Sequence, residues 1–321
     1  LYLLAMKKKL LFLFLCYSLG IFSQKKFSKE FHFISDNDLY TSTFDDRYYT
    51  SGLFLSFSYL SKEKKEAIEK VIFEWSIGHQ MFTPHKVVIK NRYQHDRPFA
   101  GYLFGSFGTH RVYNNNSSFK TSLQLGVLGS YAFSEELQGL IHDLYGFKSA
   151  QGWGYQIKNA LAVNINTEFN KFLVKDQTNH FDLSWINAAK IGTVFTSVSS
   201  GFLARIGFKP LQSLANSIAY QTNINNKNTS YFRAIESFIF IKPSIRYAFY
   251  DATLQGSFLN TSSPITRELV PFIFDIAIGF QCTTNQFNLG YTYNYNSNKS
   301  KELRFDNGHS YGSIQLSYVL K

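Results

Sequence analysis

Apolar and polar residues alternate with a period of two along most of the chain. In Phe287–Tyr295 every second residue is aromatic or Leu, and the residues between them are Asn, Gly or Thr. The same alternation runs through Leu123–Val127 and Leu161–Ile165. A period of two places successive side chains on opposite faces of a β-strand. The alternating segments are about ten residues long and often end in Tyr or Phe, which is typical of a transmembrane β-barrel.

A soluble β-sandwich gives the same alternation and is the alternative fold. Its strands are usually about five to six residues long, shorter than the segments found here. We therefore predict an all-β protein, a transmembrane antiparallel β-barrel of about 12 strands, since a single-chain barrel has an even number. The pattern gives one segment more than twelve, so a middle segment is expected to be a merger or a split: 27–36, 51–61, 70–82, 98–112, 118–131, 154–170, 179–191, 193–208, 231–249, 252–260, 268–283, 286–296 and 310–320.

One continuous apolar run, Leu10–Phe22, stands apart from this pattern. It is too short to span a bilayer as a helix. Three lysines precede it and the small residue Ser23 follows it, an arrangement typical of a secretory signal peptide. We expect residues 1–23 to be a signal peptide with an upstream extension, and residues 24–321 to form the outer-membrane barrel domain.

The composition excludes several other classes of protein. Hydrophobic residues make up 45% of the 321 residues, which is enough to bury a large surface and excludes a disordered chain. A mean hydropathy of −0.16 excludes a bundle of membrane helices. The net charge of +11 is diffuse, so it favours loops that face an anionic lipid surface over a nucleic-acid partner. Cys282 is the only cysteine outside the apolar run, which excludes an intramolecular disulfide.

The barrel topology assigns each connection to one side of the membrane. If the chain enters from the periplasm, the connections after strands one, three and five lie outside the cell. These outer loops are residues 37–50, 83–97 and 132–153, and they contain the unusual charged residues of the chain. We therefore expect the functional residues to gather at the extracellular end.

The third outer loop contains a predicted short helix, 133–146. Ser134 is the expected N-cap, glutamates occupy the first turn, and Gly146 ends the helix. Leu137, Leu140, Ile141 and Leu144 form an apolar stripe, expected to lie against the barrel wall or the membrane surface. In either case His142 is expected to face the rim of the barrel.

A series of motifs in these loops resembles one family in order and spacing. They are Asn37-Asp38, Asp46-Arg47-Tyr48-Tyr49-Thr50-Ser51-Gly52, Gln80-Met81-Phe82-Thr83-Pro84, Asp96-Arg97-Pro98-Phe99-Ala100-Gly101, Gln138-Gly139-Leu140-Ile141-His142 and Gln151-Gly152-Trp153-Gly154-Tyr155-Gln156. Over residues 31–160 the chain resembles the outer-membrane lipid A 3′-O-deacylases, whereas the C-terminal half matches only as barrel strands. The resemblance implies a calcium-dependent esterase that removes the acyl chain or chains at the 3′ position of lipid A. It also implies an active site between the barrel wall and a helix of an outer loop.

The residues can be compared with the chemistry of ester hydrolysis, which needs an activated water, a general base and a group that stabilises the oxyanion. His142 is the candidate base because an imidazole takes up a proton near neutral pH. No Gly-x-Ser-x-Gly motif is present, so we favour direct attack by water over an acyl-enzyme. In this mechanism Ca²⁺ would act as the Lewis acid.

The resemblance implies roles for further residues in the loops. Asn37 would orient the water or the ester, Asp38 would bind Ca²⁺ together with backbone carbonyls of residues 47–50, and Thr50 would support the site. Asp96, Arg97 and Gly101 are expected to be structural. Three cations are expected to bind phosphates or sugars of lipid A, with solvated loop charges as the alternative: Lys86, Lys90 and Arg92.

One position departs from the family pattern. Six residues after His142, where a related protein has a glutamate, this chain has Lys148. If that acid holds calcium or orients the histidine, Asp45, Asp46, Asp143 or water must replace it. The departure keeps a barrel without catalytic activity, structural or adhesive, as one alternative function, and a passive porin is the other. We expect a monomer in the outer membrane that acts on lipopolysaccharide from the extracellular side.

Overall fold

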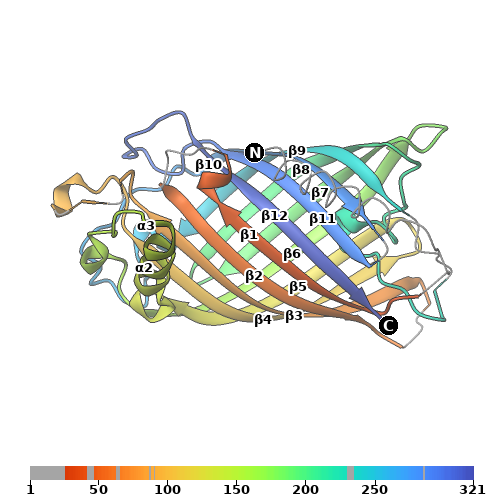
Figure 1. The fold of residues 1–321 in the computed structure, drawn as a ribbon, viewed down its shortest axis with the longest axis horizontal. Helices are drawn as coiled ribbons and strands as arrows, with labels where there is room; N and C mark the ends of the chain where they lie inside the picture. Colours follow the sequence, from red (N-terminus) through yellow and green to blue (C-terminus); the bar gives the residue numbers. More distant parts are fainter. Residues whose placement is uncertain are drawn as a thin grey trace, which may run out of the picture.

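A closed antiparallel barrel forms the body of the protein (Figure 1). The computed structural model describes residues 26–41, 47–62, 66–86, 88–89, 91–229, 235–284 and 286–321, and the expected signal peptide lies outside them. Within these residues the barrel has twelve strands, the number predicted: β1 Lys29–Asn37, β2 Tyr48–Leu60, β3 Ile68–Thr83, β4 Ala100–Tyr113, β5 Ser117–Leu128, β6 Ala160–Lys175, β7 Phe181–Gly192, β8 Phe195–Gly207, β9 Ser237–Asp251, β10 Phe272–Thr283, β11 Phe287–Asn296 and β12 His309–Leu320.

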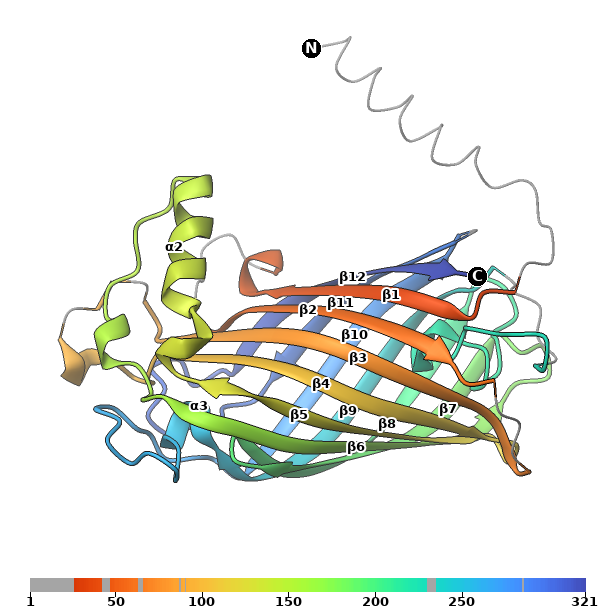
Figure 2. The same ribbon diagram turned by 90° about the horizontal axis from the view of Figure 1, so that it is seen from below.

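The first and last strands close the barrel. β1 pairs with β12 from Lys29 opposite Leu320 to Asn37 opposite Gly312. The start of β1 and the C-terminus therefore lie at one end, and the connections after odd-numbered strands lie at the other (Figure 2). We call the first the terminal end and the second the loop end.

The alternation in the sequence separates an apolar outer surface from a polar interior. Ile77, Leu125 and Ile245 point outward and are 55–61% exposed. The neighbouring position Ser76 points inward, where its hydroxyl lies 2.6 Å from that of Ser106 on β4. This is the arrangement that a lipid-facing barrel requires. Among the described residues, none of the helices is long and apolar enough to cross a membrane.

One predicted strand, 252–260, is wrong. The chain there forms the short helix α3, Ala252–Gln255, and then a loop. Asp251 caps this helix, since its Oδ1 accepts hydrogen bonds from the backbone N–H (2.9 Å) and the hydroxyl (2.6 Å) of Thr253. Gly256, with a φ of +77°, ends it. The extra segment was therefore neither a merger nor a split, but a capped turn at the loop end.

Candidate functional site

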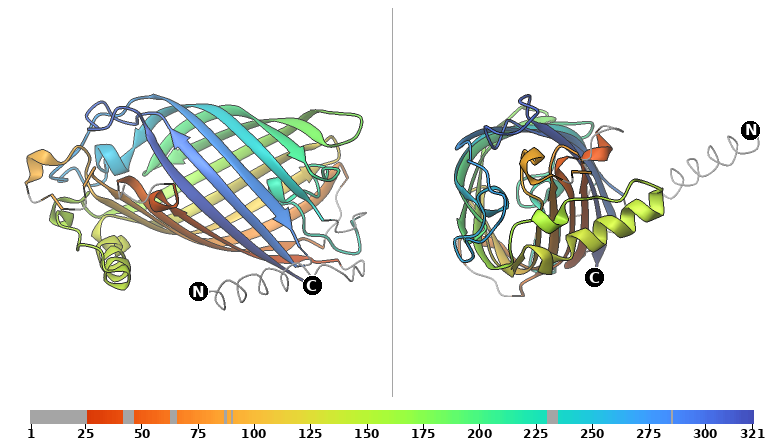
Figure 3. Two further views of the ribbon diagram at one scale, coloured as in Figure 1. Left: turned by 45° about the horizontal axis from the view of Figure 1, so that its top comes forward. Right: turned by 90° about the vertical axis from the view of Figure 1, so that its left-hand side faces the viewer.

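The three predicted outer loops all lie at the loop end of the barrel (Figure 2). The first begins with the 3₁₀ turn η1, Asp38–Tyr40, and the second contains η2, Arg92–Gln94. The third contains the helix α2, Ser134–Tyr145, which lies at the edge of the barrel mouth in the end-on view (Figure 3). The connections after β7, β9 and β11 reach the same end.

The ends of α2 agree in part with the sequence prediction. Gly146 closes the helix in the left-handed conformation, at a φ of +70°, as expected for glycine there. The predicted N-cap is wrong, because Phe133 occupies that position with a φ of +55° and Ser134 is the first helical residue. Ser134 is turned instead toward β3, where its Oγ lies 2.9 Å from Nε2 of His79. The hydroxyl thus fixes the helix to the barrel wall.

The face of α2 that is turned inward is polar. Ser134, Gln138 and His142 follow one another at intervals of four residues and are all buried. Of the predicted apolar stripe, Leu140 and Leu144 are 68% and 77% exposed. The stripe was expected to lie either against the barrel wall or against the membrane surface. These two leucines are not packed against the wall, so an apolar membrane surface is the environment that fits them.

His142 is held in one orientation by the backbone that follows the helix. Its Nδ1 lies 2.6 Å from the carbonyl oxygen of Lys148. Because a carbonyl only accepts, Nδ1 carries the proton, and in the neutral ring Nε2 then carries the lone pair. The ring of Phe147 packs against the imidazole edge at 5.7 Å between centroids. The ring is therefore in the tautomer that a general base at Nε2 requires.

Asn37 and Asp38 begin the first outer loop. Oδ1 of Asn37 accepts the backbone N–H of Leu39 at 2.8 Å and so caps η1. Oδ2 of Asp38 accepts the backbone N–H of Arg47 at 2.6 Å, and Asp38 is only 1% exposed. The loop thus fixes a buried carboxylate at the end of β1.

Thr50 lies close to Asn37 and Asp38, on the neighbouring strand β2. It is buried near the start of β2, where the pairing with β3 shifts by one residue, and its Oγ1 lies 2.6 Å from that of Thr83. Its neighbour Ser51 is paired with Asn37. The structure therefore brings Asn37, Asp38 and Thr50 together around β1 and β2, and holds His142 on α2, a separate element of the same end.

The expected calcium ligands are only partly represented. Nowhere in the described part of the chain do three or more Asp, Glu, His or Cys side chains gather as a metal site. Calcium also accepts backbone carbonyls and water as ligands, so the buried carboxylate of Asp38 fits a site made largely of backbone oxygens. Asp45 and Asp46 lie outside the described residues.

A cavity of about 380 Å³, which we call the rim cavity, opens at the loop end. Three of its cations come from three different loops: Lys86 precedes β4, Arg267 precedes β10 and Arg304 precedes β12. Arg267 is paired with Glu302 at 2.8 Å. Because Lys86 lines the cavity, its ammonium group could contact an anion bound there. Arg92 does not line this cavity but lies 4.8 Å from the ring of Tyr93, and Lys90 lies outside the described residues.

Asp96 joins the loops around the rim cavity. Its Oδ2 accepts hydrogen bonds from the hydroxyl of Tyr48 (2.9 Å) and the backbone N–H of Arg304 (3.1 Å). Its Oδ1 accepts the backbone N–H of His85 at 3.0 Å and lies 3.1 Å from Nδ1 of that ring. Burial raises the pKa of Asp96, but these hydrogen bonds outweigh it and hold the pKa below its ordinary value. Its predicted structural role agrees with these contacts.

Arg97, the next residue, also holds the loops together. Its Nη2 donates a hydrogen bond to the carbonyl of Thr253 in α3 at 3.1 Å. Its guanidinium lies 4.8 Å from the ring centroid of Phe82. Burial lowers the pKa of Arg97 to about 10, so the group remains a cation at neutral pH. The Asp-Arg motif is therefore a structural junction, as predicted.

A row of aromatic rings connects the rim cavity with α2. His95 lies edge-on to Phe99 at 5.8 Å, and Phe99 packs on Trp153 at 4.6 Å between centroids. Nε1 of Trp153 donates a hydrogen bond to Oε1 of Gln138 at 2.8 Å. The motif residues Gln138 and Trp153 therefore position α2 relative to the second loop.

The sequence analysis did not identify several residues of the rim cavity, among them the basic side chains of His85, Arg267 and Arg304. Arg267 and Arg304 lie in the C-terminal half, where the motifs give no guidance. The signal that could have found them is the parity of the strands, since connections after strands nine and eleven also reach the loop end. The false strand at 252–260 reversed that parity for every later connection.

Comparisons with known proteins complete the description. The family described as Outer membrane protein LpxR matches residues 10–320. The structure of LpxR from Salmonella typhimurium is similar with a TM-score of 0.72 and 15% identity, over 90% of this chain and 99% of that one. The β-domain of the Bordetella autotransporter Brka has a TM-score of 0.48 and 7% identity, over 92% and 99% of the two chains. No curated protein matches the chain significantly.

Proposed function

Since the chain belongs to the LpxR family of outer-membrane proteins, an ester hydrolase family of lipid A 3′-O-deacylases, we propose that His142 activates the water that cleaves the 3′ ester. The observation that carries this proposal is the 2.6 Å contact between Nδ1 of His142 and the carbonyl of Lys148. A base needs a fixed orientation and a lone pair aimed at the proton it takes. The backbone contact supports the fixed orientation and puts the lone pair on Nε2.

The same contact accounts for the departure at position 148. Where a glutamate is expected, the chain uses the main-chain carbonyl of Lys148 to hold the imidazole, and any residue has that oxygen. The missing carboxylate therefore does not prevent His142 from acting as a base. This argues against the alternative of a barrel that has lost its catalytic activity.

The proposed step transfers one proton in each direction. Nε2 of His142 takes a proton from water as the water oxygen attacks the ester carbonyl carbon. The bond between this carbon and the 3′ oxygen then breaks, and the sugar oxygen takes the proton back from the imidazolium. The products are a free fatty acid and the 3′-hydroxyl of the sugar.

Ca²⁺ would be held by the carboxylate of Asp38 and by backbone oxygens of its loop. When bound, it would stabilise negative charge on the ester carbonyl oxygen. Oδ1 of Asn37 accepts the backbone N–H of Leu39. The Nδ2 group of Asn37 would donate a hydrogen bond to the water or the ester. Thr50, held by Thr83, would support the wall beneath them.

The rim cavity would bind the phosphorylated sugar part of the substrate. Lys86 and Arg304 line it, and neither forms an ion pair with a carboxylate in the described part of the chain. Such cations suit phosphate oxygens. Lys90 and Arg92 remain proposed contributors from the same loop. The exposed Leu140 and Leu144 of α2 would meet the acyl chains of the outer leaflet.

This assignment places the loop end on the extracellular side, where the lipid A leaflet lies. The enzyme would act there as a monomer after removal of the signal peptide. The proposed mechanism does not involve a nucleic acid.

The test is mass spectrometry of lipid A from cells that express each variant. His142→Ala should lower 3′-deacylation by about 10²- to 10⁴-fold, the usual cost of losing a general base. Asp38→Ala should also inactivate the enzyme, but excess Ca²⁺ should restore part of the activity, and chelation should silence the wild type reversibly. His180→Ala, in the turn between β6 and β7 at the other end of the barrel, is the matched control. Undiminished activity of His142→Ala, or activity in chelator, would contradict the proposal.

A further inference from the structure

The connection between β8 and β9 does not stay outside the barrel. Its described residues, 208–229 and 235–236, include the 3₁₀ turn η5, Ile218–Tyr220, and lie at the terminal end. Leu214, Ile218 and Tyr220 are buried. In a loop that simply ran over the membrane surface, such residues would be exposed. We call residues 208–229 the inner segment.

Side chains from two strands that are four places apart around the barrel bind the inner segment. Nζ of Lys70, on β3, donates hydrogen bonds to the carbonyls of Ala215 (2.5 Å) and Thr222 (3.0 Å). From β7, the hydroxyl of Ser184 lies 2.6 Å from that of Tyr220. Because these strands are far apart around the barrel, a segment that contacts both must cross the lumen.

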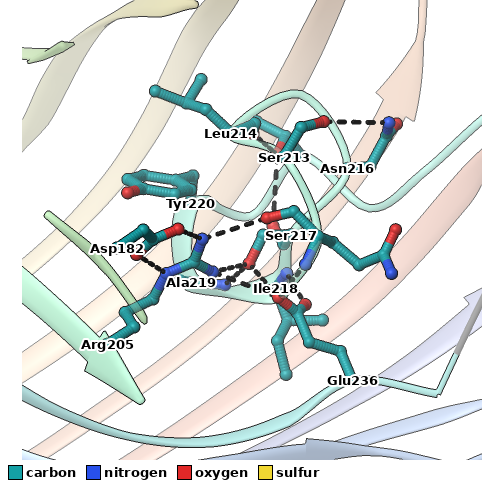
Figure 4. Close-up of polar contacts among 12 residues, drawn as sticks. Asp182, Arg205, Ser213, Leu214, Asn216, Ser217, Ile218, Ala219, Tyr220 and Glu236 are labelled. Carbon is teal, nitrogen blue, oxygen red and sulfur yellow. Dashed lines mark hydrogen bonds and ion pairs between the residues drawn. The ribbon is translucent and has the colours of Figure 1, made fainter. Parts of the chain in front are cut away.

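A buried arginine anchors the inner segment to the wall (Figure 4). Arg205, on β8, binds the carboxylate of Asp182 with Nε (2.9 Å) and Nη2 (2.5 Å). Its Nη1 lies 3.1 Å from Oε1 of Glu236 and 2.5 Å from Oγ of Ser217. Glu236 also accepts the backbone N–H of Ile218 at 3.1 Å. One cation thus holds two carboxylates and the start of η5 together.

Apolar side chains fill the remaining space between the inner segment and the strands. They form two buried clusters, to which the inner segment contributes Leu214, Ala215, Tyr220 and Ile224. The strands and the segment before β1 contribute the others: Val112, Ile186 and Leu203 in one cluster, and Phe27, Leu60, Ile72 and Val319 in the other. The seal that these contacts form is therefore apolar as well as hydrogen-bonded.

Above this seal the lumen is polar and hollow. One cavity of about 260 Å³ is floored by residues 218–221, and another of about 400 Å³ is lined by β1–β3 and β7–β12. Both are lined by Lys242 and Asn294. A hollow polar barrel of this kind would be expected to pass ions unless something closed it.

We infer that residues 208–229 are a plug that closes the terminal end of the barrel, and that the protein therefore does not conduct ions or small solutes. This inference is independent of the proposed esterase activity, because it concerns the opposite end of the molecule. It also argues against the passive porin that the sequence left as an alternative function.

The experiment measures conductance of the purified, folded protein in planar lipid bilayers. Wild type should show no channel steps in 1 M KCl. A variant in which residues 211–229 are replaced by a short Gly-Ser linker should conduct in defined steps. Arg205→Ala should show transient openings that the wild type lacks, since it leaves two buried carboxylates without their cation. Lys227→Ala, an exposed position of the same segment, is the matched control and should stay silent.

Two measurements keep the result interpretable. Heat-dependent gel mobility selects only preparations in which each variant has formed a closed barrel, and Lys70→Met provides a second way to loosen the plug if Arg205→Ala does not fold. Steady conductance of the wild type would overturn the inference. So would a linker variant that folds as a barrel and remains silent, because the inner segment would then not be the seal.

Discussion

The orientation of His142 depends on a backbone atom, and this limits what its sequence neighbourhood can reveal. The sequence identified the histidine from its place on a short helix and from the motif around it. It could not identify the anchor, because the carbonyl of Lys148 belongs to the main chain and carries no residue-specific signal. Substitutions at position 148 that keep the backbone should therefore be tolerated.

Lys148→Ala is expected to retain 3′-deacylation within about twofold of wild type, since exposed substitutions away from specific contacts have small effects. Lys148→Glu should behave in the same way unless the new carboxylate reaches the metal, in which case the Ca²⁺ concentration for half-maximal activity should fall. Deacylation of purified lipid A at several Ca²⁺ concentrations measures both. A large loss in Lys148→Ala would mean that the ammonium group, and not the carbonyl, matters.

The stability of the second outer loop should depend on pH through His95. Burial lowers the pKa of His95 below 6.5, so the unfolded loop binds a proton more readily than the folded loop. The contribution of neutral His95 to the stability of the folded loop is therefore complete above about pH 6.5. It is lost as the pH falls toward the pKa that His95 has in the folded loop. Asp96, whose pKa is also lowered, adds a further loss below pH 3.8. Hydrogen exchange of residues 91–99 should show less protection at pH 5.5 than at pH 7.5, whereas His95→Gln should show little difference between the two.

At the level of elements, the strands were predictable, whereas the starts of the short helices were not. The period-two pattern reflects the two faces of the barrel wall, so it identified all twelve strands, with ends within six residues of those observed, together with one false strand. Whether a short apolar stretch continues a strand depends on local hydrogen bonds, such as those that Thr253 donates to the carboxylate of Asp251 at the start of α3. Likewise Ser134 looked like an N-cap, but His79 binds its hydroxyl from β3, a contact between distant parts of the chain.

The seat of α2 on β4 gives a prediction at this scale. A Cβ at Gly101 would lie 2.2 Å from Oγ of Ser134 and 2.9 Å from Cβ of Ala132, so Gly101→Ala should push the start of α2 away from the wall. Displacing a catalytic group by about 1 Å can cost about 10²-fold in rate, and we expect a loss of about 10- to 10²-fold in kcat with the barrel intact.

Gly105→Ala on the same strand is the matched control, because the nearest atom to its added Cβ is 4.0 Å away. Heat-dependent gel mobility should show both variants as closed barrels. Equal activity of the two variants would mean that α2 does not depend on its contact with Gly101.

At the level of the whole molecule, the site is completed by loops that are distant in sequence. The motifs cover residues 31–160, yet Arg267 and Arg304 line the same cavity as Lys86. Closure of the barrel brings these loops together, and closure is a property of the full set of strands. This is why motif reasoning identified Lys86 and missed Arg267 and Arg304.

Arg304→Ala should raise KM for phosphorylated lipid A about tenfold and leave kcat nearly unchanged, since a charged hydrogen bond used equally in the ground and transition states affects binding only. With dephosphorylated lipid A the variant and the wild type should be alike. Lys301→Ala, an exposed residue of the same loop, is the control. A uniform loss on both substrates would indicate a structural role for Arg304.

The pairing of β1 with β12 has a consequence for biogenesis. Contacts between residues as far apart as Lys29 and Leu320 are slow to form, because nearly the whole chain must be ordered first. Asn37 is paired along this seam with Gly312, and η1 contacts β12. The loop that carries Asp38 therefore reaches its final position only when β1 and β12 have paired. A nascent or half-inserted barrel would lack this part of the centre, so lipid hydrolysis would begin only once insertion is finished.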